Sequence, residues 1–158
     1  MHLLAIDPGP EQSAFVLLGP DFNRLQSGKL VNDDLAAMCC GELLVEDRCV
    51  IEMIASYGMP VGREVFETCV WIGRFMEAVG AHRCDRLTRI EVKNHLCHSA
   101  RAKDSNIRQA LIDRLGAPGT KKEPGPTYGI SGDVWAALAV AVTWWDKQEA
   151  TCPLGPER

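Results

Sequence analysis

Short apolar runs bounded by turn residues dominate the first third of the chain. The first run, LLAID at residues 3–7, ends in Asp7, and Pro8-Gly9 then turns the chain. Further segments of this kind predict strands over residues 13–19, 24–31, 48–54 and 82–91. Because the connection after residue 7 is short, the first two strands are expected to form an antiparallel hairpin.

Apolar residues at helical spacing predict helices over residues 33–44, 61–79, 105–116 and 133–145. In the longest of them, 61–79, the stripe expected to face the core comprises Val61, Val65, Cys69, Ile72, Met76 and Val79. Other apolar residues of this helix lie outside the stripe, namely Phe66, Val70, Trp71 and Phe75. One sheet cannot cover so much apolar surface, so the 61–79 helix is predicted to have a second partner, such as another subunit in a homodimer.

Two connections between these elements are unusual. Residues 92–104 form a basic connection, and residues 117–132 form a long loop rich in Gly and Pro. Long loops are uncommon in compact domains and are often functional.

Length and composition indicate a single globular domain. The 158 residues suffice for one good core, and 46% apolar and 24% charged residues are ordinary values. We expect a domain over residues 1–148 and a C-terminal tail over 149–158. No stretch reaches the length of a membrane span, and the N-terminus lacks the pattern of a secretory leader, so a soluble, cytoplasmic protein is expected.

Charge and cysteine content limit which partners and which metal sites are expected. The net charge of −4 argues against a protein coated in positive charge but permits a local basic groove. The seven cysteines include no C-x-x-C pair, which favours reduced thiols. His95, Cys97 and His98 suggest zinc, but no second ligand pair has the usual spacing, so zinc is disfavoured.

Three carboxylates fall at predicted junctions: Asp7 ends the first strand, Glu52 lies near the end of the 48–54 strand, and Asp133 opens the last helix. Carboxylates in buried segments are usually paired or bound to metal. If the three converge, Mg²⁺ or Mn²⁺ would be natural counter-charges, and two such ions can cleave a phosphodiester. The alternatives are a turn residue, an ion pair with an arginine and a helix cap, respectively.

The chain resembles the RuvC-type Holliday-junction resolvases of the ribonuclease H-like superfamily, in particular the small RuvC-like proteins of phages and prophages. The matching segments follow the family order: IDPG (6–9), IE (51–52), EVK (91–93), AKDSNIRQAL (102–111) and GDVWAALAVAV (132–142). The resemblance implies an α/β fold with a mixed five-stranded sheet, three antiparallel strands followed by two parallel ones, flanked by helices. It also implies hydrolysis of four-way DNA junctions by a homodimer that uses Mg²⁺ or Mn²⁺, as two ions, with Asp7, Glu52 and Asp133 as catalytic metal ligands.

One position departs from that family. A second acidic residue is expected three positions after Asp133 on the last helix, and Ala136 stands there. Its methyl group supplies no oxygen, so one ion is expected to be under-coordinated and Mn²⁺ to be favoured over Mg²⁺. The alternative is that Glu123, in the 117–132 loop, replaces the missing carboxylate.

Basic and aromatic residues provide candidates for DNA contact. Residues that can neutralise phosphates are Lys93, Arg101, Lys103, Arg108, Lys121 and Lys122. Tyr57, in the loop after Glu52, can stack on an unpaired base. For each of these residues, a solvated surface position or packing within its own loop is the simpler alternative.

Three other functions compete with junction cleavage. A ribonuclease H-like nuclease acting on flaps, forks or RNA hybrids would use the same site. A non-catalytic module that binds branched DNA would explain Ala136. A small-molecule kinase or ATPase of the actin-like superfamily also begins with an aspartate after its first strand, but the chain is too short for two lobes and lacks glycine-rich phosphate loops.

Overall fold

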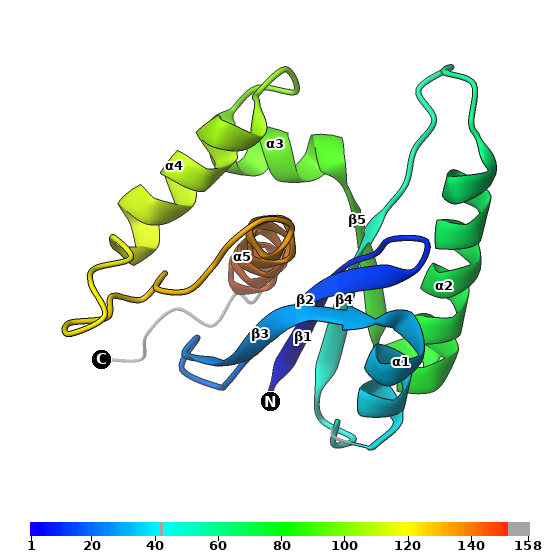
Figure 1. Ribbon diagram of the computed structural model, residues 1–158, viewed down its shortest axis with the longest axis horizontal. Helices are drawn as coiled ribbons and strands as arrows, with labels where there is room; N and C mark the ends of the chain where they lie inside the picture. Colours follow the sequence, from blue (N-terminus) through cyan, green and yellow to red (C-terminus); the bar gives the residue numbers. More distant parts are fainter. Residues whose placement is uncertain (42, 152–158) are drawn as a thin grey trace.

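A computed structural model describes residues 1–41 and 43–151, and it contains one five-stranded sheet in the order β3-β2-β1-β4-β5 (Figure 1). The strands are β1 (Leu3–Asp7), β2 (Gln12–Leu18), β3 (Arg24–Val31), β4 (Arg48–Met53) and β5 (Cys84–Thr88). The pairs β1–β2 and β2–β3 are antiparallel, and β1–β4 and β4–β5 are parallel. The predicted mixed sheet, with three antiparallel strands followed by two parallel ones, is therefore confirmed.

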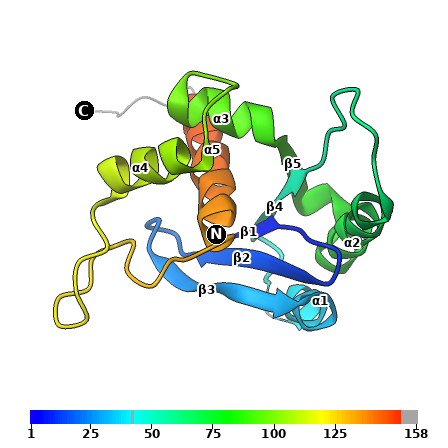
Figure 2. The same ribbon diagram turned by 45° about the horizontal axis from the view of Figure 1, so that its top comes forward.

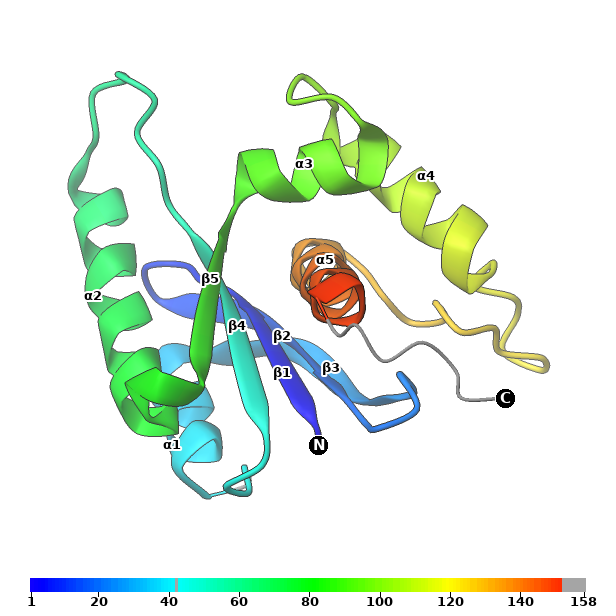
Figure 3. The ribbon, with the colours of Figure 1, turned by 180° about the vertical axis from the view of Figure 1, so that it is seen from behind.

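Helices cover both faces of the sheet. They are α1 (Asn32–Gly41), α2 (Arg63–Val79), α3 (Arg89–Cys97), α4 (Asp104–Leu115) and α5 (Val134–Thr151), with a short 3-10 helix, η1 (Ala81–Arg83), before β5. On one face lie α1 and α2, and on the other lies α5, with α3 and α4 on the side of α5 away from α2 (Figures 2 and 3). None of the described helices combines the length and the apolar character needed to cross a bilayer.

Alternation along β1 divides the core into two halves. Leu3 and Ala5 pack with α5, whereas Leu4 and Ile6 pack with residues of α1 and α2. Because side chains of a strand alternate between faces, Asp7 continues the row of Leu3 and Ala5. The first carboxylate of interest therefore lies on the α5 side of the sheet.

The core face of α2 differs from the predicted stripe. Its buried residues are Thr68, Ile72, Phe75 and Val79, whereas Cys69 is exposed. The prediction was thus wrong for Cys69 and for Phe75, which is fully buried. Phe66 and Val70 do lie outside the core, with 60% and 59% of their surface exposed, so α2 presents apolar surface to solvent.

Three further elements differ from the expected boundaries. The basic connection predicted over 92–104 is wrong in its first half, because α3 begins directly after β5. Thr88 caps α3: its side chain accepts a hydrogen bond from Glu91 N–H, and the Glu91 carboxylate accepts one from Thr88 N–H. The first helix ends at Gly41, short of residue 44, and α5 continues to Thr151. A boundary between domain and tail at residue 149 stays a prediction, and residues 152–158 lie outside the described residues.

Candidate metal centre

Asp7 and Glu52 end neighbouring parallel strands. Ile6 pairs with Ile51, so Asp7 and Glu52, each one residue further along, come side by side at the carboxyl edge of the sheet. Val50 packs on the α5 side, and alternation places Glu52 on that side with Asp7. The sheet itself therefore brings the first two carboxylates together.

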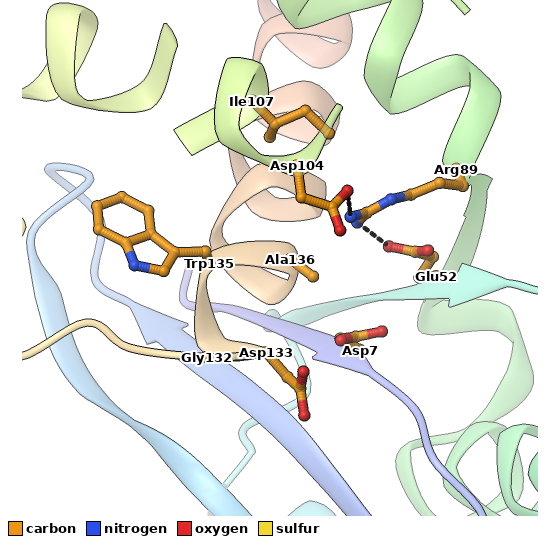
Figure 4. Close-up of a pocket in the computed structure, with 9 residues that line it drawn as sticks. All are labelled: Asp7, Glu52, Arg89, Asp104, Ile107, Gly132, Asp133, Trp135 and Ala136. Carbon is orange, nitrogen blue, oxygen red and sulfur yellow. Dashed lines mark hydrogen bonds and ion pairs between the residues drawn. The ribbon is translucent and has the colours of Figure 1, made fainter. Parts of the chain in front are cut away.

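Asp133 joins them from the residue before α5. Asp7, Glu52 and Asp133 line one pocket of about 260 Å³, which Figure 4 shows between the sheet edge and the start of α5. The Asp133 carboxylate accepts a hydrogen bond from Lys29 Nζ of β3 at 2.6 Å. The predicted convergence is thus present in the structure, and the catalytic and metal-binding roles of the three residues stay predictions.

The alternative roles considered for Asp7, Glu52 and Asp133 were a turn residue, an ion pair with an arginine and a helix cap, and the structure bears on each of them. The turn after Asp7 is held by other groups: Gly9 N–H donates to Ser13 Oγ, and Asn32 Nδ2 donates to Gly9 O. Glu52 does pair with an arginine, Arg89. The first turn of α5 is bonded through the Asp133 backbone carbonyl, while its carboxylate bonds Lys29.

Two charged residues that the sequence did not single out complete the pocket. Arg89, the first residue of α3, donates from Nη1 to Glu52 Oε2 at 3.1 Å and from Nη2 to Asp104 Oδ1 at 2.6 Å. Asp104 is the first residue of α4 and lines the same pocket. The guanidinium therefore bridges the carboxylates of Glu52 and Asp104.

The carboxylate of Asp7 is the most perturbed acid of the site. Burial raises the pKa of Asp7 to about 7, and repulsion from Glu52 and Asp133 adds to the increase, while Arg89 and Lys29 oppose it. No described residue donates a hydrogen bond to this carboxylate. Asp7 thus lacks a direct counter-charge near neutral pH.

Glu52 and Arg89 each affect the pKa of the other, as expected of a half-buried ion pair. Burial raises the pKa of Glu52, and the charge of Arg89 offsets part of that increase. Burial alone would lower the pKa of Arg89, but Glu52 and Asp104 outweigh it and raise the pKa. For Glu52, burial thus outweighs the stabilisation that Arg89 gives to its charged form.

The donor set fits a hard divalent cation. Asp7, Glu52, Asp104 and Asp133 supply only carboxylate oxygens, the ligands that Mg²⁺ and Mn²⁺ prefer. Within residues 1–41 and 43–151, no three His, Cys, Asp or Glu side chains stand close enough to share one ion in this arrangement. The donor set thus fits such a cation by its chemistry, while in this arrangement Arg89 pairs with Glu52 and Asp104, and Lys29 pairs with Asp133.

The segment considered for zinc is engaged elsewhere. His95 Nε2 contacts Asp146 Oδ2 at 2.5 Å, and Cys97 packs against the α5 side of the core. His98 ends α3 in a left-handed conformation. His95 and Cys97 are thus engaged in contacts within the protein.

Ala136 lines the pocket, as its place three residues after Asp133 implies. Glu123 is not among the lining residues. It lies exposed in a tight turn of the 117–132 loop, where its N–H donates to Thr120 Oγ1 and its carbonyl accepts from Thr120 N–H. Glu123 is thus poorly placed to replace the missing carboxylate.

Trp135, between Asp133 and Ala136, has an unusual environment. Its indole is buried beside the pocket, and its Nε1 has no hydrogen-bond partner among the described residues. The guanidinium of Arg108 lies 5.0 Å from the centre of its ring. Figure 4 shows the ring on the side of α5 away from Glu52, so it forms the wall of the pocket rather than part of the acidic cluster.

The predicted DNA-binding residues fall into two groups by their distance from the pocket. Lys93 is half-buried on α3, and its charge lowers the pKa of Glu52, so it lies near the acids. Arg108 borders the pocket through Trp135. Although Lys103 directly precedes the lining residue Asp104, the remaining residues are exposed and do not line the pocket: Tyr57, Arg101, Lys103, Lys121 and Lys122. Of these, Tyr57 is 59% exposed and has a positive φ of 43°.

Comparison with known proteins identifies the architecture. No protein-family model and no curated protein sequence match the chain. Among solved structures, Thermus thermophilus RuvC superposes with a TM-score of 0.72 at 15% identity, covering 98% of this chain and 100% of that one. T. thermophilus RuvC in complex with a Holliday junction substrate gives a TM-score of 0.71 at 16% identity, covering 98% and 99%. Over nearly its whole length, the chain therefore has the ribonuclease H-like fold of RuvC.

Proposed function

We propose that the protein is a metal-dependent endonuclease that hydrolyses phosphodiesters of branched DNA, with four-way junctions as its main substrate. The observation that supports this most is the meeting of Asp7, Glu52 and Asp133 in one pocket at the carboxyl edge of a RuvC-like sheet. The choice of substrate is supported by the likeness of this fold to that of T. thermophilus RuvC, whose structure is known in complex with a Holliday junction substrate.

In this proposal Asp7, Glu52 and Asp133 would hold Mg²⁺ or Mn²⁺, as two ions. When bound, such ions activate a water molecule and stabilise the leaving oxygen. The protein's part is to hold the ligands: β1 and β4 fix Asp7 and Glu52, and the start of α5 fixes Asp133. The burial that raises the pKa of Asp7 also keeps bulk water from screening the ion.

Binding of the DNA backbone is assigned to the basic residues around the pocket. Lys93 and Arg108 are close enough to neutralise phosphates next to the scissile bond, and Lys121 and Lys122 can reach a neighbouring duplex arm. Two cuts placed symmetrically across a four-way junction suit a homodimer with two-fold symmetry. The exposed Phe66 and Val70 of α2 are the surface proposed for this dimer.

The test compares the wild-type protein with Glu52→Gln on labelled four-way junctions in Mg²⁺ or Mn²⁺. The wild type is expected to cut, and Glu52→Gln to lose cleavage by at least about a thousandfold while still binding the junction, since removing a ligand removes the charge stabilisation of the reaction. The same loss is expected for Asp7→Asn.

The remaining outcomes separate the alternatives. Preferential cutting of flaps, forks or RNA hybrids in the same substrate panel would assign another substrate to the same site. Tight binding of junctions without any cutting by the wild type would show a non-catalytic module, the reading that Ala136 favours. Equal cutting by wild type and Glu52→Gln at saturating metal would contradict the assigned site.

A further inference from the structure

The pocket contains an acid that does not belong to the expected ligand set. Position 136, where the resemblance implies a carboxylate, is alanine, and Asp104 of α4 lines the same pocket. Figure 4 shows Asp104 on the same side of the pocket as Ala136, with its carboxylate directed toward Arg89. The two residues belong to different helices, so their proximity is a property of the fold and not of sequence spacing.

Arg89 shows that Asp104 and Glu52 can share a cation. A single guanidinium bonds both carboxylates, at 2.6 Å to Asp104 and 3.1 Å to Glu52. The two ligands differ in freedom, because the Asp104 side chain is 80% exposed whereas that of Glu52 is 15% exposed. Asp104 can therefore change its position at little cost, while Glu52 stays fixed by the sheet.

The backbone beneath Asp104 is firmly placed. Ala102 and Ile107, on either side of it, are buried, and Ile107 packs in the core with residues of α5. Arg89 likewise starts α3 directly after β5, with the Thr88–Glu91 capping box holding the turn. Both side chains thus extend from anchored helix starts into the pocket.

We propose that Asp104 supplies the metal-binding carboxylate that α5 lacks at Ala136, and that Arg89 is an internal cation that holds Glu52 and Asp104 until a divalent ion replaces it. This inference rests on the proposed function, because it concerns ligands of the same metal centre. It assigns the substitution for the missing acid to α4 rather than to Glu123 of the loop.

A purely structural role for Asp104 is the competing explanation. An ion pair with a largely exposed aspartate contributes little to stability, typically less than about 1 kcal/mol. Under that explanation, removing Asp104 would leave the affinity for metal unchanged, or raise it by freeing space. The two explanations thus predict opposite effects on metal binding, which can be measured without DNA and without turnover.

The experiment is a titration of each full-length protein with Mn²⁺, in which free Mn²⁺ is measured by electron paramagnetic resonance. Asp104→Asn is expected to remove one bound ion or to weaken its binding by about tenfold or more. Asp113→Asn is the matched control, since Asp113 lies on the same helix and bonds only Gln109. That control is expected to bind Mn²⁺ like the wild type.

A double-mutant cycle tests whether Asp104 and position 136 are equivalent. In the Asp104→Asn background, Ala136→Asp is expected to restore the lost ion, whereas in the wild type the same substitution adds little. Arg89→Gln is expected to raise Mn²⁺ affinity because no internal cation needs to be displaced. Thermal unfolding in EDTA checks that each variant is folded.

Failure of this inference is distinguishable from failure of the proposed function. If Asp104→Asn binds Mn²⁺ like the wild type while Glu52→Gln does not, the metal centre stands and the role of Asp104 is wrong. If Glu52→Gln also binds Mn²⁺ like the wild type, the metal centre itself is wrong. The inference would also be overturned if Ala136→Asp changed Mn²⁺ binding by the same amount in the wild type and in Asp104→Asn.

Discussion

At the scale of single residues, the raised pKa of Asp7 couples the proposed site to stability. A carboxyl group whose pKa is raised in the folded state binds its proton more tightly there than in the unfolded chain. Its ionisation therefore destabilises the fold, and the effect grows as the pH rises from about 4, the ordinary value, to about 7, the value in the fold. A bound divalent cation would reverse this effect.

Asp7→Asn is accordingly expected to stabilise the metal-free protein at pH 8, by up to about 4 kcal/mol, because it removes the buried charge. At pH 4 the gain should disappear, since Asp7 is then protonated in the folded state. Urea unfolding in EDTA at both pH values measures this. Equal stability of wild type and variant at pH 8 would show that Asp7 is not strained by its surroundings.

Metal provides the control for that measurement. Addition of Mg²⁺ or Mn²⁺ at pH 8 should stabilise the wild type, because the ion binds only the folded state, and should have little effect on Asp7→Asn.

The residues of the site differ in how far sequence alone could identify them. Asp7 and Glu52 were predictable because each interrupts an apolar strand, where an unpaired carboxylate is costly. Arg89 was not singled out, since the strand 82–91 was expected to include it. The pairing of Met53 with Thr88 shows where a clue lay: once β5 is placed beside β4, the residue after Thr88 must lie near Glu52. Sequence does not provide that strand order without a relative.

Asp104 shows a different limit. It starts a helix, where an acidic residue is favoured by the helix dipole, so its presence needs no functional explanation. Only the folded arrangement, which brings the start of α4 to the pocket of β1 and β4, indicates another role.

At the scale of elements, α2 is the clearest case of a partly correct prediction. Helical spacing allowed either Cys69 or Thr68 to face the core, and hydrophobicity favoured Cys69. Thr68 is buried instead because its hydroxyl donates to Glu64 O within the helix at 2.8 Å, which satisfies its polar group. The core face of α2 therefore includes Phe75.

Helix α3 was not predicted because Val92 is its only buried residue, so the sequence shows no apolar stripe there.

The exposed apolar residues of α2 predict a homodimer. Replacing Phe66 and Val70 together by serine should shift the protein to monomer at micromolar concentration, because it removes the apolar surface proposed to be buried between subunits. Sedimentation velocity measures the change. Leu25→Ser is the control, since Leu25 is also about half exposed but lies on β3. A wild type that is monomeric with and without junction DNA would contradict the dimer.

At the scale of the whole molecule, the net charge of −4 means that the proposed binding of DNA would depend on a local basic surface. Lys121 and Lys122 are expected to contribute as phosphate contacts, so their joint replacement by glutamine should weaken junction binding and reduce the slope of log K against log salt by about 2. Fluorescence anisotropy at several salt concentrations measures both.

Arg48→Gln serves as the control for that comparison, because Arg48 begins β4, at the end of the strand opposite Glu52. An unchanged slope in the double lysine variant would exclude the 117–132 loop from the DNA surface.

The position of α5 has a consequence for how the protein is made. This helix fills one half of the core, with residues 137–142 buried, yet it is the last of the described helices to be synthesised. Leu3, Ala5 and Val50, which pack beside it, emerge from the ribosome far earlier. At a synthesis rate of roughly 5–20 residues per second, that face of the nascent sheet stays exposed for several seconds before α5 is made. The acidic pocket likewise can form only after synthesis has passed Asp133, which contributes one of its carboxylates.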